Sequence, residues 1–443
     1  MDTFGNAHAK VIPLDLSENQ FQIYNKISRN YSHSFLFESL SGPEALAETS
    51  VMGFNPKIIF KGYYDKVEII ENNNTRIIKT NDPFIELKKL LGKSNDQKYR
   101  YLGGAVGVVN YDSIRLVENI SEETTLTQPI MEFGIYDDGL LYDNVDKKLF
   151  YFYHDVNRYD QLIVSEDSFN EFHSSEVTPN MNKEKFSNIV NKAKQYIHDG
   201  DIFQVVLSRK FEFETSGDNL TLYKTLRKLN PSPYMYHLKQ DSKTIIGASP
   251  EMLVRITDDK VETFPIAGTR KITDNEEKNK ALSDELIHDE KELAEHTMLV
   301  DLGRNDIGRV CKYGTVHPES LMEIKRFSHV QHIVSHVVGN LDSKNDMFDA
   351  FQAVFPAGTV SGAPKVRAMQ IIDELESEER GPYAGAVGYF SYNGCCDFAI
   401  AIRSIFIENN KGFVQSGAGI VSDSIAKMNL KKLNTKQVQC FKH

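Results

Sequence analysis

Strand-like and helix-like segments alternate irregularly along this chain, and this irregularity limits its fold more than any other feature. Residues 57–61, 66–70 and 76–79 are β-rich runs, and the last two flank the turn-forming segment Glu71-Asn-Asn-Asn-Thr75. This pattern predicts an antiparallel meander. A further strand-like run at 399–406 alternates with helical stretches without the regular repeat of a doubly wound or barrel fold. The sequence therefore predicts the α+β class.

A polar segment divides the chain into two parts. Residues 174–183, Ser-Ser-Glu-Val-Thr-Pro-Asn-Met-Asn-Lys, form the best candidate for a linker. Apolar residues recur at helical spacing from Phe186 to Ile197, and Gly200 is a natural C-terminal stop. We predict an N-terminal domain of residues 1–173 and a second domain of residues 184–443 that opens with this long amphipathic helix.

Composition and charge restrict the partners of the chain. Its 443 residues are 40% hydrophobic and 26% charged, as in ordinary globular proteins. A net charge of −11 without a basic run argues against nucleic-acid binding. There is no apolar stretch of about 18 residues and no basic N-terminal leader, and the four cysteines include no C-x-x-C pair. These features predict a cytoplasmic protein with a small-molecule partner, no membrane segment and no zinc site.

An acidic helix-like segment at residues 289–306 carries a candidate metal site. Glu292, Glu295 and His296 stand at i, i+3 and i+4, which places them on one stripe of a helix. The two carboxylates repel each other unless a cation lies between them, and oxygen ligands suit a hard ion such as Mg²⁺. For this segment alone, a solvated acidic face is the alternative.

Two glycine-rich segments predict a ligand pocket. Thr359-Val-Ser-Gly-Ala-Pro-Lys365 precedes a helix-like stretch, so backbone N–H groups and hydroxyls at the helix start suit an anion. In Gln415-Ser-Gly-Ala-Gly-Ile-Val421 the glycines lack a Cβ and let a ligand approach closely. Arg403 adds a guanidinium that is well shaped for a carboxylate. Together these segments predict a pocket for a substrate with several carboxylates.

Further motifs accompany these loops in a fixed order: Asp201-Ile-Phe-Gln-Val-Val-Leu-Ser-Arg209, Gly247-Ala-Ser-Pro-Glu251, Pro265-Ile-Ala-Gly-Thr-Arg270, Asp301-Leu-Gly-Arg-Asn-Asp306 and His329-Val-Gln-His-Ile-Val-Ser335. The set resembles the chorismate-utilising enzymes, and within them the large subunits of anthranilate synthases. The resemblance covers nearly the whole chain and is dense from about residue 180 to 424. It implies a four-layer α/β/β/α sandwich with antiparallel sheets and one chorismate site, where Mg²⁺ bridges the substrate carboxylate to Glu292 and Glu295.

Two positions separate the branches of the family that this chain resembles. Branches that add water carry a lysine base at the position of Gln204, and an amide cannot deprotonate water. The aminodeoxychorismate branch typically has a nucleophilic lysine at the position of Ala267, and alanine offers no nucleophile. The resemblance thus implies a lyase that adds ammonia to C2 of chorismate with loss of the C4 hydroxyl. Elimination of pyruvate then gives anthranilate, the first committed step of tryptophan biosynthesis, with aminodeoxychorismate synthesis as the alternative.

The resemblance also implies roles for single residues. Glu251 resembles the general acid that protonates the departing hydroxyl, and His332 resembles the residue that acts near the ring during elimination. Gln204 and Thr359 complete the catalytic set. Tyr383 and Arg403 would hold the carboxylate of the enolpyruvyl arm. The full substrate-binding set is Gly268, Thr269, Tyr383, Arg403, Gly417, Ala418, Gly419 and Lys365.

A partner and an inhibitor are implied in the same way. None of the cysteines lies in a glycine-flanked nucleophile turn, so ammonia would come from a separate glutamine amidotransferase subunit, in a heterotetramer. Leu36-Phe-Glu-Ser39 and Asn230-Pro-Ser-Pro-Tyr-Met235 resemble the element that binds tryptophan in feedback-inhibited members. The predicted contacts are Glu38, Ser39, Pro233, Tyr234 and Met235. A strand end packed on a turn is the alternative.

The C-terminal tail departs from the pattern of the family. Family members carry a Glu-x-x-Glu pair on the last helix, where this chain has Asn429 and Lys432. An ammonium in place of a metal ligand removes a negative charge and adds a repulsive positive one. A form with little turnover that only binds chorismate or tryptophan is therefore a further alternative.

A shift of reading frame would explain the tail. Residues 427–432 can be encoded so that the next frame, starting at the last base of codon 427, gives glutamate at position 429 and can give a second at 432. Our hypothesis is that the tail from about Met428 is a frameshifted C-terminal helix. Gene sequence downstream of codon 427 that encodes no glutamate-bearing helix in that frame would rule it out.

Overall fold

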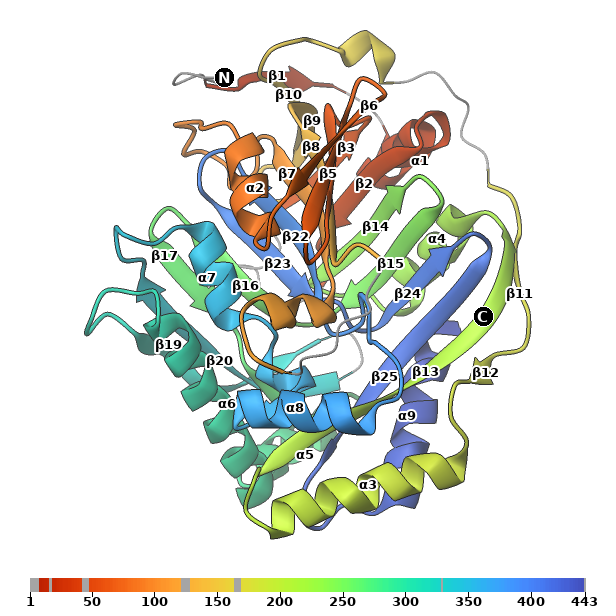
Figure 1. Cartoon of the computed structure of the whole chain (residues 1–443), viewed down its shortest axis with the longest axis vertical. Coiled ribbons are helices and arrows are strands. Elements are labelled where there is room, and N and C mark those ends of the chain that lie inside the picture. The colour runs from red at the N-terminus through yellow and green to blue at the C-terminus, as the bar shows by residue number, and fades with distance from the viewer. Residues whose placement is uncertain are drawn as a thin grey trace.

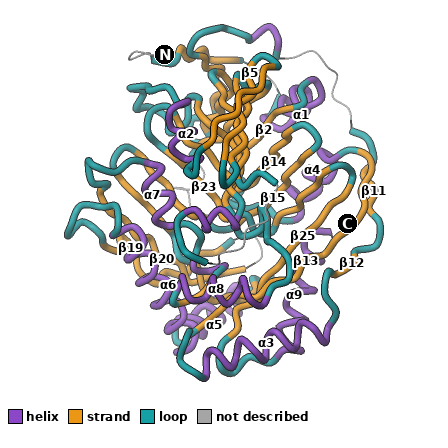
Figure 2. Tube along the Cα trace, viewed as in Figure 1, coloured by secondary structure: helices purple, strands orange, loops and turns teal. Residues whose placement is uncertain are grey.

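The computed structural model describes residues 8–15, 18–41, 48–120, 128–162, 169–327 and 330–441, with side chains described up to residue 434. Within this part of the chain the strands form two large sheets with antiparallel pairings, which pack face to face around a shared hydrophobic core (Figure 1). Helices lie at the periphery (Figure 2). The predicted α+β class with antiparallel sheets is therefore confirmed.

The first sheet contains thirteen of the described strands. Its order is β1-β10-β9-β3-β2-β14-β15-β24-β25-β13-β11, and β12 and β21 also pair with β13. The strands are β1 (Lys10–Leu14), β2 (His33–Glu38), β3 (Thr49–Phe54), β9 (Asp138–Asp143), β10 (Lys148–Tyr153), β11 (Phe172–Ser174), β12 (Thr178–Pro179), β13 (Gln204–Gly217), β14 (Tyr234–Gln240), β15 (Lys243–Ser249), β21 (Gly362–Ala363), β24 (Ser404–Glu408) and β25 (Lys411–Ile420).

The second sheet contains twelve of the described strands, in the order β18-β20-β17-β16-β23-β22-β7-β8-β4-β5-β6, with β19 paired to β20. The strands are β4 (Ile58–Gly62), β5 (Lys66–Glu71), β6 (Asn74–Lys79), β7 (Gly104–Val109), β8 (Met131–Tyr136), β16 (Met252–Thr257), β17 (Lys260–Thr263), β18 (Ile266–Lys271), β19 (His317–Arg326), β20 (Val330–Asn340), β22 (Ala386–Ser391) and β23 (Cys396–Ile400). The predicted meander is confirmed as β4, β5 and β6. Asn72 and Asn73 form its tight turn with φ of 49° and 64°, a conformation that asparagine tolerates.

The helices divide between the two sheets. On the first sheet, α1 (Gln20–Asn30) and α4 (Asn219–Leu229) cover β2, β3, β14 and β15, while α3 (Lys183–His198), α8 (Lys365–Leu375) and α9 (Ala426–Phe441) cover β13 and β25. On the second sheet lie α2 (Pro83–Leu90), α5 (Glu276–Ile287), α6 (Glu290–Gly308) and α7 (Met347–Val354). Short 3₁₀ helices are η2 (Tyr111–Leu116), η3 (Tyr159–Gln161) and η4 (Gly358–Val360). The helix predicted after residue 183 is confirmed as α3, capped by Asn182.

The two halves of the chain share both sheets. Strand β2 pairs with β14 across the first sheet, and β7 pairs with β22 across the second. Within residues 174–183, strand β12 pairs with β13. The division into residues 1–173 and 184–443 therefore does not correspond to separate sheets, and the domain assignment stays a prediction.

One predicted strand is wrong. The run 399–406 is not continuous, because β23 ends at Ile400 in the second sheet and β24 begins at Ser404 in the first. Arg403 lies in this crossing with a φ of 51°, a left-handed conformation that interrupts a strand. An apolar run gives no sign of such a change of sheet, since both parts are buried.

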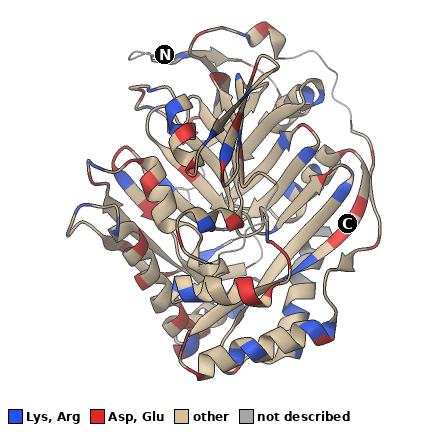
Figure 3. Cartoon of the chain, in the orientation of Figure 1, with Lys and Arg blue, Asp and Glu red and all other residues tan. Residues whose placement is uncertain are grey.

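Charged residues of both signs are interspersed over the two sheets (Figure 3). Among the described residues, we find no helix with the length and apolar character needed to cross a membrane.

Candidate active site

Glu251 lies where the chain passes from the first sheet to the second, between β15 and β16. The crossing at residues 401–403 runs beside it. The Ile400 N–H donates to the Glu251 carbonyl at 3.1 Å, and the Ala248 N–H donates to the Arg403 carbonyl at 3.2 Å. Two segments far apart in sequence are thus joined at the point where each changes sheet.

Burial makes Glu251 a proton donor. The residue is only 8% exposed, and desolvation raises the pKa of its carboxyl to about 8, although Thr359 and the Arg403 charge act in the opposite direction. At neutral pH the carboxyl therefore keeps its proton, as a general acid requires. Thr359 stands beside it in η4, and both residues line a small cavity against α6. The buried Thr359 hydroxyl has no hydrogen bond of normal geometry within the described residues.

His332 is held neutral on β20. Its Nδ1 lies 2.7 Å from the Gly268 carbonyl oxygen, and a carbonyl can only accept, so Nδ1 carries the proton. The Thr269 hydroxyl oxygen lies 3.2 Å from the same nitrogen. Burial lowers the pKa of His332 to about 4, and the Arg403 charge acts in the same direction. Nε2 is therefore a lone-pair acceptor at neutral pH.

The second glycine-rich segment is the end of β25. Gly417 and Gly419 share one face of the strand, and a Cβ on Gly417 would lie 2.6 Å from the Tyr383 hydroxyl oxygen. A Cβ on Gly419 would lie 2.7 Å from Nε2 of Gln204. Ala418 points the other way, into the cluster beneath α3, α8 and α9, so its backbone alone can face a ligand on the glycine face.

The acidic pair on α6 adjoins these residues. Oε2 of Glu292 lies 3.2 Å from where a Cβ of Gly268 would stand, and Gln204 donates to Oε1 of Glu295 at 3.4 Å. Burial and the Glu292 charge raise the pKa of Glu295. His296 is not part of this stripe: it is fully buried, and its Nε2 lies 2.6 Å from the Ser335 hydroxyl. The pair, Gln204, Gly268 and His332 therefore form one continuous site.

The residues present do not fit a Mg²⁺ site. Among the described residues, no group of three or more His, Cys, Asp or Glu side chains is placed to hold a metal ion. Lys365, expected to bind substrate, instead donates to Asp306 at 2.6 Å and to the Val354 carbonyl at 2.9 Å. Its ammonium therefore serves to neutralise a buried carboxylate behind the site.

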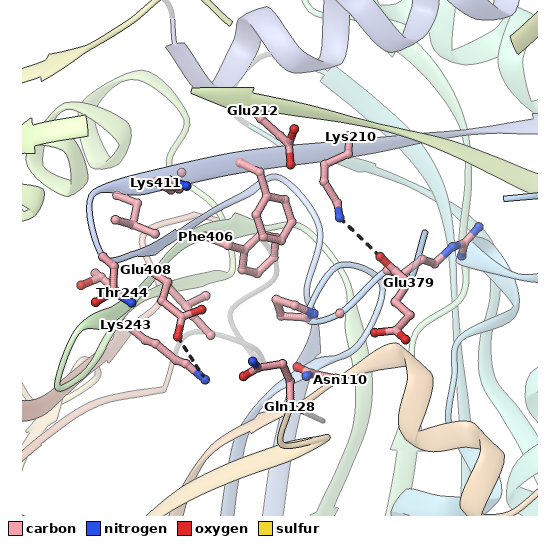
Figure 4. Close-up of a pocket in the computed structure, with 18 of the residues that line it drawn as sticks. Asn110, Gln128, Lys210, Glu212, Lys243, Thr244, Glu379, Phe406, Glu408 and Lys411 are labelled. Atoms are coloured by element: carbon pink, nitrogen blue, oxygen red, sulfur yellow. Dashed lines mark hydrogen bonds and ion pairs between the residues drawn. The ribbon is translucent and has the colours of Figure 1, made fainter. Parts of the chain in front are cut away.

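A larger groove of about 1230 Å³ lies elsewhere, between the β24–β25 hairpin, β13 and the start of β8. Figure 4 shows its lining, with Phe406 in the wall and Lys210 and Lys243 directed toward the carbonyl of Glu379 and the carboxylate of Glu408. Its charged side chains are paired with each other, and it contains none of the predicted catalytic residues. The candidate active site rests on the convergence of Glu251, His332 and Gln204, not on cavity size.

The residues predicted to bind tryptophan line one cavity between the sheets. Glu38, Ser39, Pro233, Tyr234 and Met235 all contribute to it. Met235 pairs with Glu38 across β14 and β2, which explains why two distant segments meet. The buried Ser39 hydroxyl has no hydrogen-bond partner within the described residues.

Sequence analysis missed the partners of Glu38. Its carboxylate accepts from the Tyr223 hydroxyl at 2.7 Å and from two nitrogens of Arg227, both on α4. Arg100 and Arg255 also line the cavity. No spacing in the sequence indicates these contacts, because the residues are more than 180 positions from Glu38 or belong to other strands.

Comparison with known proteins places this geometry. The model of the chorismate binding enzyme family matches residues 32–437. The chain belongs to the chorismate-binding enzyme family. It is 43% identical to anthranilate synthase component 1 of Acetivibrio thermocellus, over 92% of this chain and 89% of that protein. It is 39% identical to aminodeoxychorismate synthase component 1 of Bacillus subtilis, over 96% and 94%.

A solved structure agrees with the fold. The crystal structure of anthranilate synthase component I from Streptococcus pneumoniae TIGR4 superposes with a TM-score of 0.80 at 37% identity, and the match covers 89% of this chain and 92% of that chain. The expected sandwich of two antiparallel sheets with helices is therefore confirmed for this member of the family.

The packing at Gly417 predicts the effect of one methyl group. In Gly417→Ala the new Cβ would meet the Tyr383 hydroxyl at 2.6 Å and Val206 Cγ1 at 2.7 Å, so the sheet or the tyrosine must move. We expect the free energy of unfolding, measured by urea denaturation, to fall by about 1–3 kcal/mol. Gly308→Ala at the end of α6 is the control, since nothing lies within 4 Å of its Cβ position, and it should not destabilise. Equal stability of the two variants would contradict the close approach at Gly417.

Proposed function

We propose that this chain is the large subunit of an anthranilate synthase, which aminates chorismate and eliminates pyruvate. The observation that carries the proposal is Glu251, a buried carboxyl with a pKa of about 8, placed beside Thr359 and near Arg403. A neutral carboxyl can donate a proton to a departing hydroxyl, which would otherwise leave as a poor leaving group.

The chemistry runs in two steps. Ammonia forms a bond to C2 of the ring as the bond from C4 to its hydroxyl breaks, and the proton of Glu251 converts that hydroxyl to water. The C2 proton and the enolpyruvyl oxygen then leave, which releases pyruvate and makes the ring aromatic. Neutral His332 can accept a hydrogen bond or a proton near the ring through Nε2. Arg403 supplies positive charge for a substrate carboxylate.

The nature of two side chains favours ammonia over other nucleophiles. Gln204 lies against Gly419 and Glu295, where an amide cannot activate water. Ala267 on β18 offers no nucleophile for a covalent intermediate, which argues against the aminodeoxychorismate reaction. Aminodeoxychorismate synthesis remains the second candidate, because a relative of that name matches 96% of the chain.

The nitrogen source would be a second subunit. Relatives are named component 1, and we propose that a glutamine amidotransferase partner delivers ammonia to this chain in a heterotetramer. We also propose that the cavity between β2 and β14 binds tryptophan as a feedback inhibitor. The unpaired Ser39 hydroxyl supports a polar ligand there, and Met235 supplies an apolar wall for an indole.

The product distinguishes the candidate reactions. With chorismate, excess ammonium and excess Mg²⁺ at pH 8, we expect anthranilate, detected by its fluorescence and by mass. Glu251→Gln keeps the shape but removes the proton, and should lower kcat by about 10²–10⁴. Glu378→Gln, in the distant groove, is the matched control and should leave kcat unchanged. Accumulation of an aminodeoxychorismate would refute the proposal, as would equal loss in both variants.

Tryptophan binding has a direct optical readout, because the chain contains no tryptophan of its own. Excitation of added L-tryptophan near 295 nm should give an emission that shifts to the blue as protein is titrated. Ser39→Ala removes one hydrogen bond, and we expect affinity to fall by about threefold to tenfold. Ser187→Ala, on exposed α3, should bind like the parent. An unchanged spectrum, or no difference between the variants, would argue against this cavity.

A further inference from the structure

The last helix brings an unusual pair of side chains to the acidic site. Leu430 and Leu433 of α9 pack with Ala418 and Ile420 of β25, which fixes the helix on the outer face of the first sheet. Asn429 and Lys432 follow the same helix one turn apart. The charge of Lys432 lowers the pKa of Glu295, so the ammonium lies within electrostatic reach of the acidic pair.

Glu292 already has a cation of the chain. Arg270 donates to it at 3.4 Å, and also to Glu285 at 3.1 Å and Asp289 at 3.0 Å. Lys291 is directed toward Asp423 at 2.7 Å. Each carboxylate of the pair is therefore influenced by basic side chains of this protein, Arg270 at Glu292 and Lys432 near Glu295.

Asn429 cannot take the place of a carboxylate ligand. It is 4% exposed, and its Nδ2 has no hydrogen-bond partner within the described residues. A buried unpaired amide N–H₂ is costly, and it is a donor where a hard cation needs oxygen. This residue and Lys432 stand where the acidic pair would need two more carboxylates.

We propose that in this chain the ammonium of Lys432 partly neutralises Glu292 and Glu295 in place of a divalent cation, so that the free protein binds Mg²⁺ weakly. The inference rests on the proposed function for the identity of the site, but it concerns cation binding alone. Four side chains, Glu292, Glu295, Asn429 and Lys432, carry one net negative charge between them. Glutamates at 429 and 432 would make this four, with oxygen ligands on both sides.

Cation binding tests this without substrate. Calorimetric titration of the purified full chain with Mg²⁺ alone, repeated with Mn²⁺ and electron paramagnetic resonance of the free ion, counts bound ions directly. We expect the double variant Asn429→Glu/Lys432→Glu to bind one ion at least about tenfold more tightly than the parent, because it adds two carboxylates and removes a cation. Lys432→Gln should give an intermediate gain.

Lys427→Glu is the matched control, since this exposed lysine lies on another side of α9 and the charge change at that position is the same. It should bind like the parent, and thermal melts establish that each variant folds. A parent that already binds one ion as tightly as the double variant overturns the proposal, and so does a double variant that gains nothing. If the double variant gains Mg²⁺ but forms no anthranilate, the inference stands and the proposed function fails.

Discussion

The site depends on two backbone crossings that the structure holds side by side. Residues 249–252 and 400–404 each carry the chain from one sheet to the other, and two backbone hydrogen bonds join them. Because both sheets are buried against each other, the groups at this junction lose water. The Glu251 carboxyl is attached here, and its raised pKa follows from that position rather than from a charged neighbour.

The rest of the site is arranged around neutral and charged groups in a fixed pattern. Glu251 and His332 are both neutral at pH 7, for the same reason of burial, while Arg403 carries its charge near both. A carboxyl that can give a proton and an imidazole that can accept one are thus available to one ligand. The acidic pair on α6 lies next to them through Gly268 and Gln204. Its charge is shared with Arg270 and with the tail helix, which makes the tail part of the site's electrostatics.

Local patterns in the sequence predicted local structure well. The β4–β6 meander and helix α3 were both predicted, because alternation, turn residues and caps act within a few residues. The convergence of Glu251, His332 and Gln204 could be expected only from resemblance, since they come from different sheets. The broken strand at residues 399–406 could not be predicted, because burial on both sides of Arg403 hides the change of sheet. The same holds for Arg227 and Tyr223, which reach Glu38 from a helix distant in sequence. His296 fits a helical stripe with Glu292, yet tertiary packing turns it into the core.

The protonation state of Glu251 is the central claim, and infrared difference spectroscopy measures it directly. Spectra of the parent minus Glu251→Gln, recorded from pH 5 to 9, isolate the C=O stretch of one protonated carboxyl. Since the folded-state pKa lies above that of the unfolded chain, the proton is retained at pH 7 and lost as the pH rises through about 8. A carboxyl band that persists at pH 7 and fades near pH 8 agrees with this account. A band that has vanished by pH 6 would contradict it, because the residue would then be an ordinary ionised glutamate.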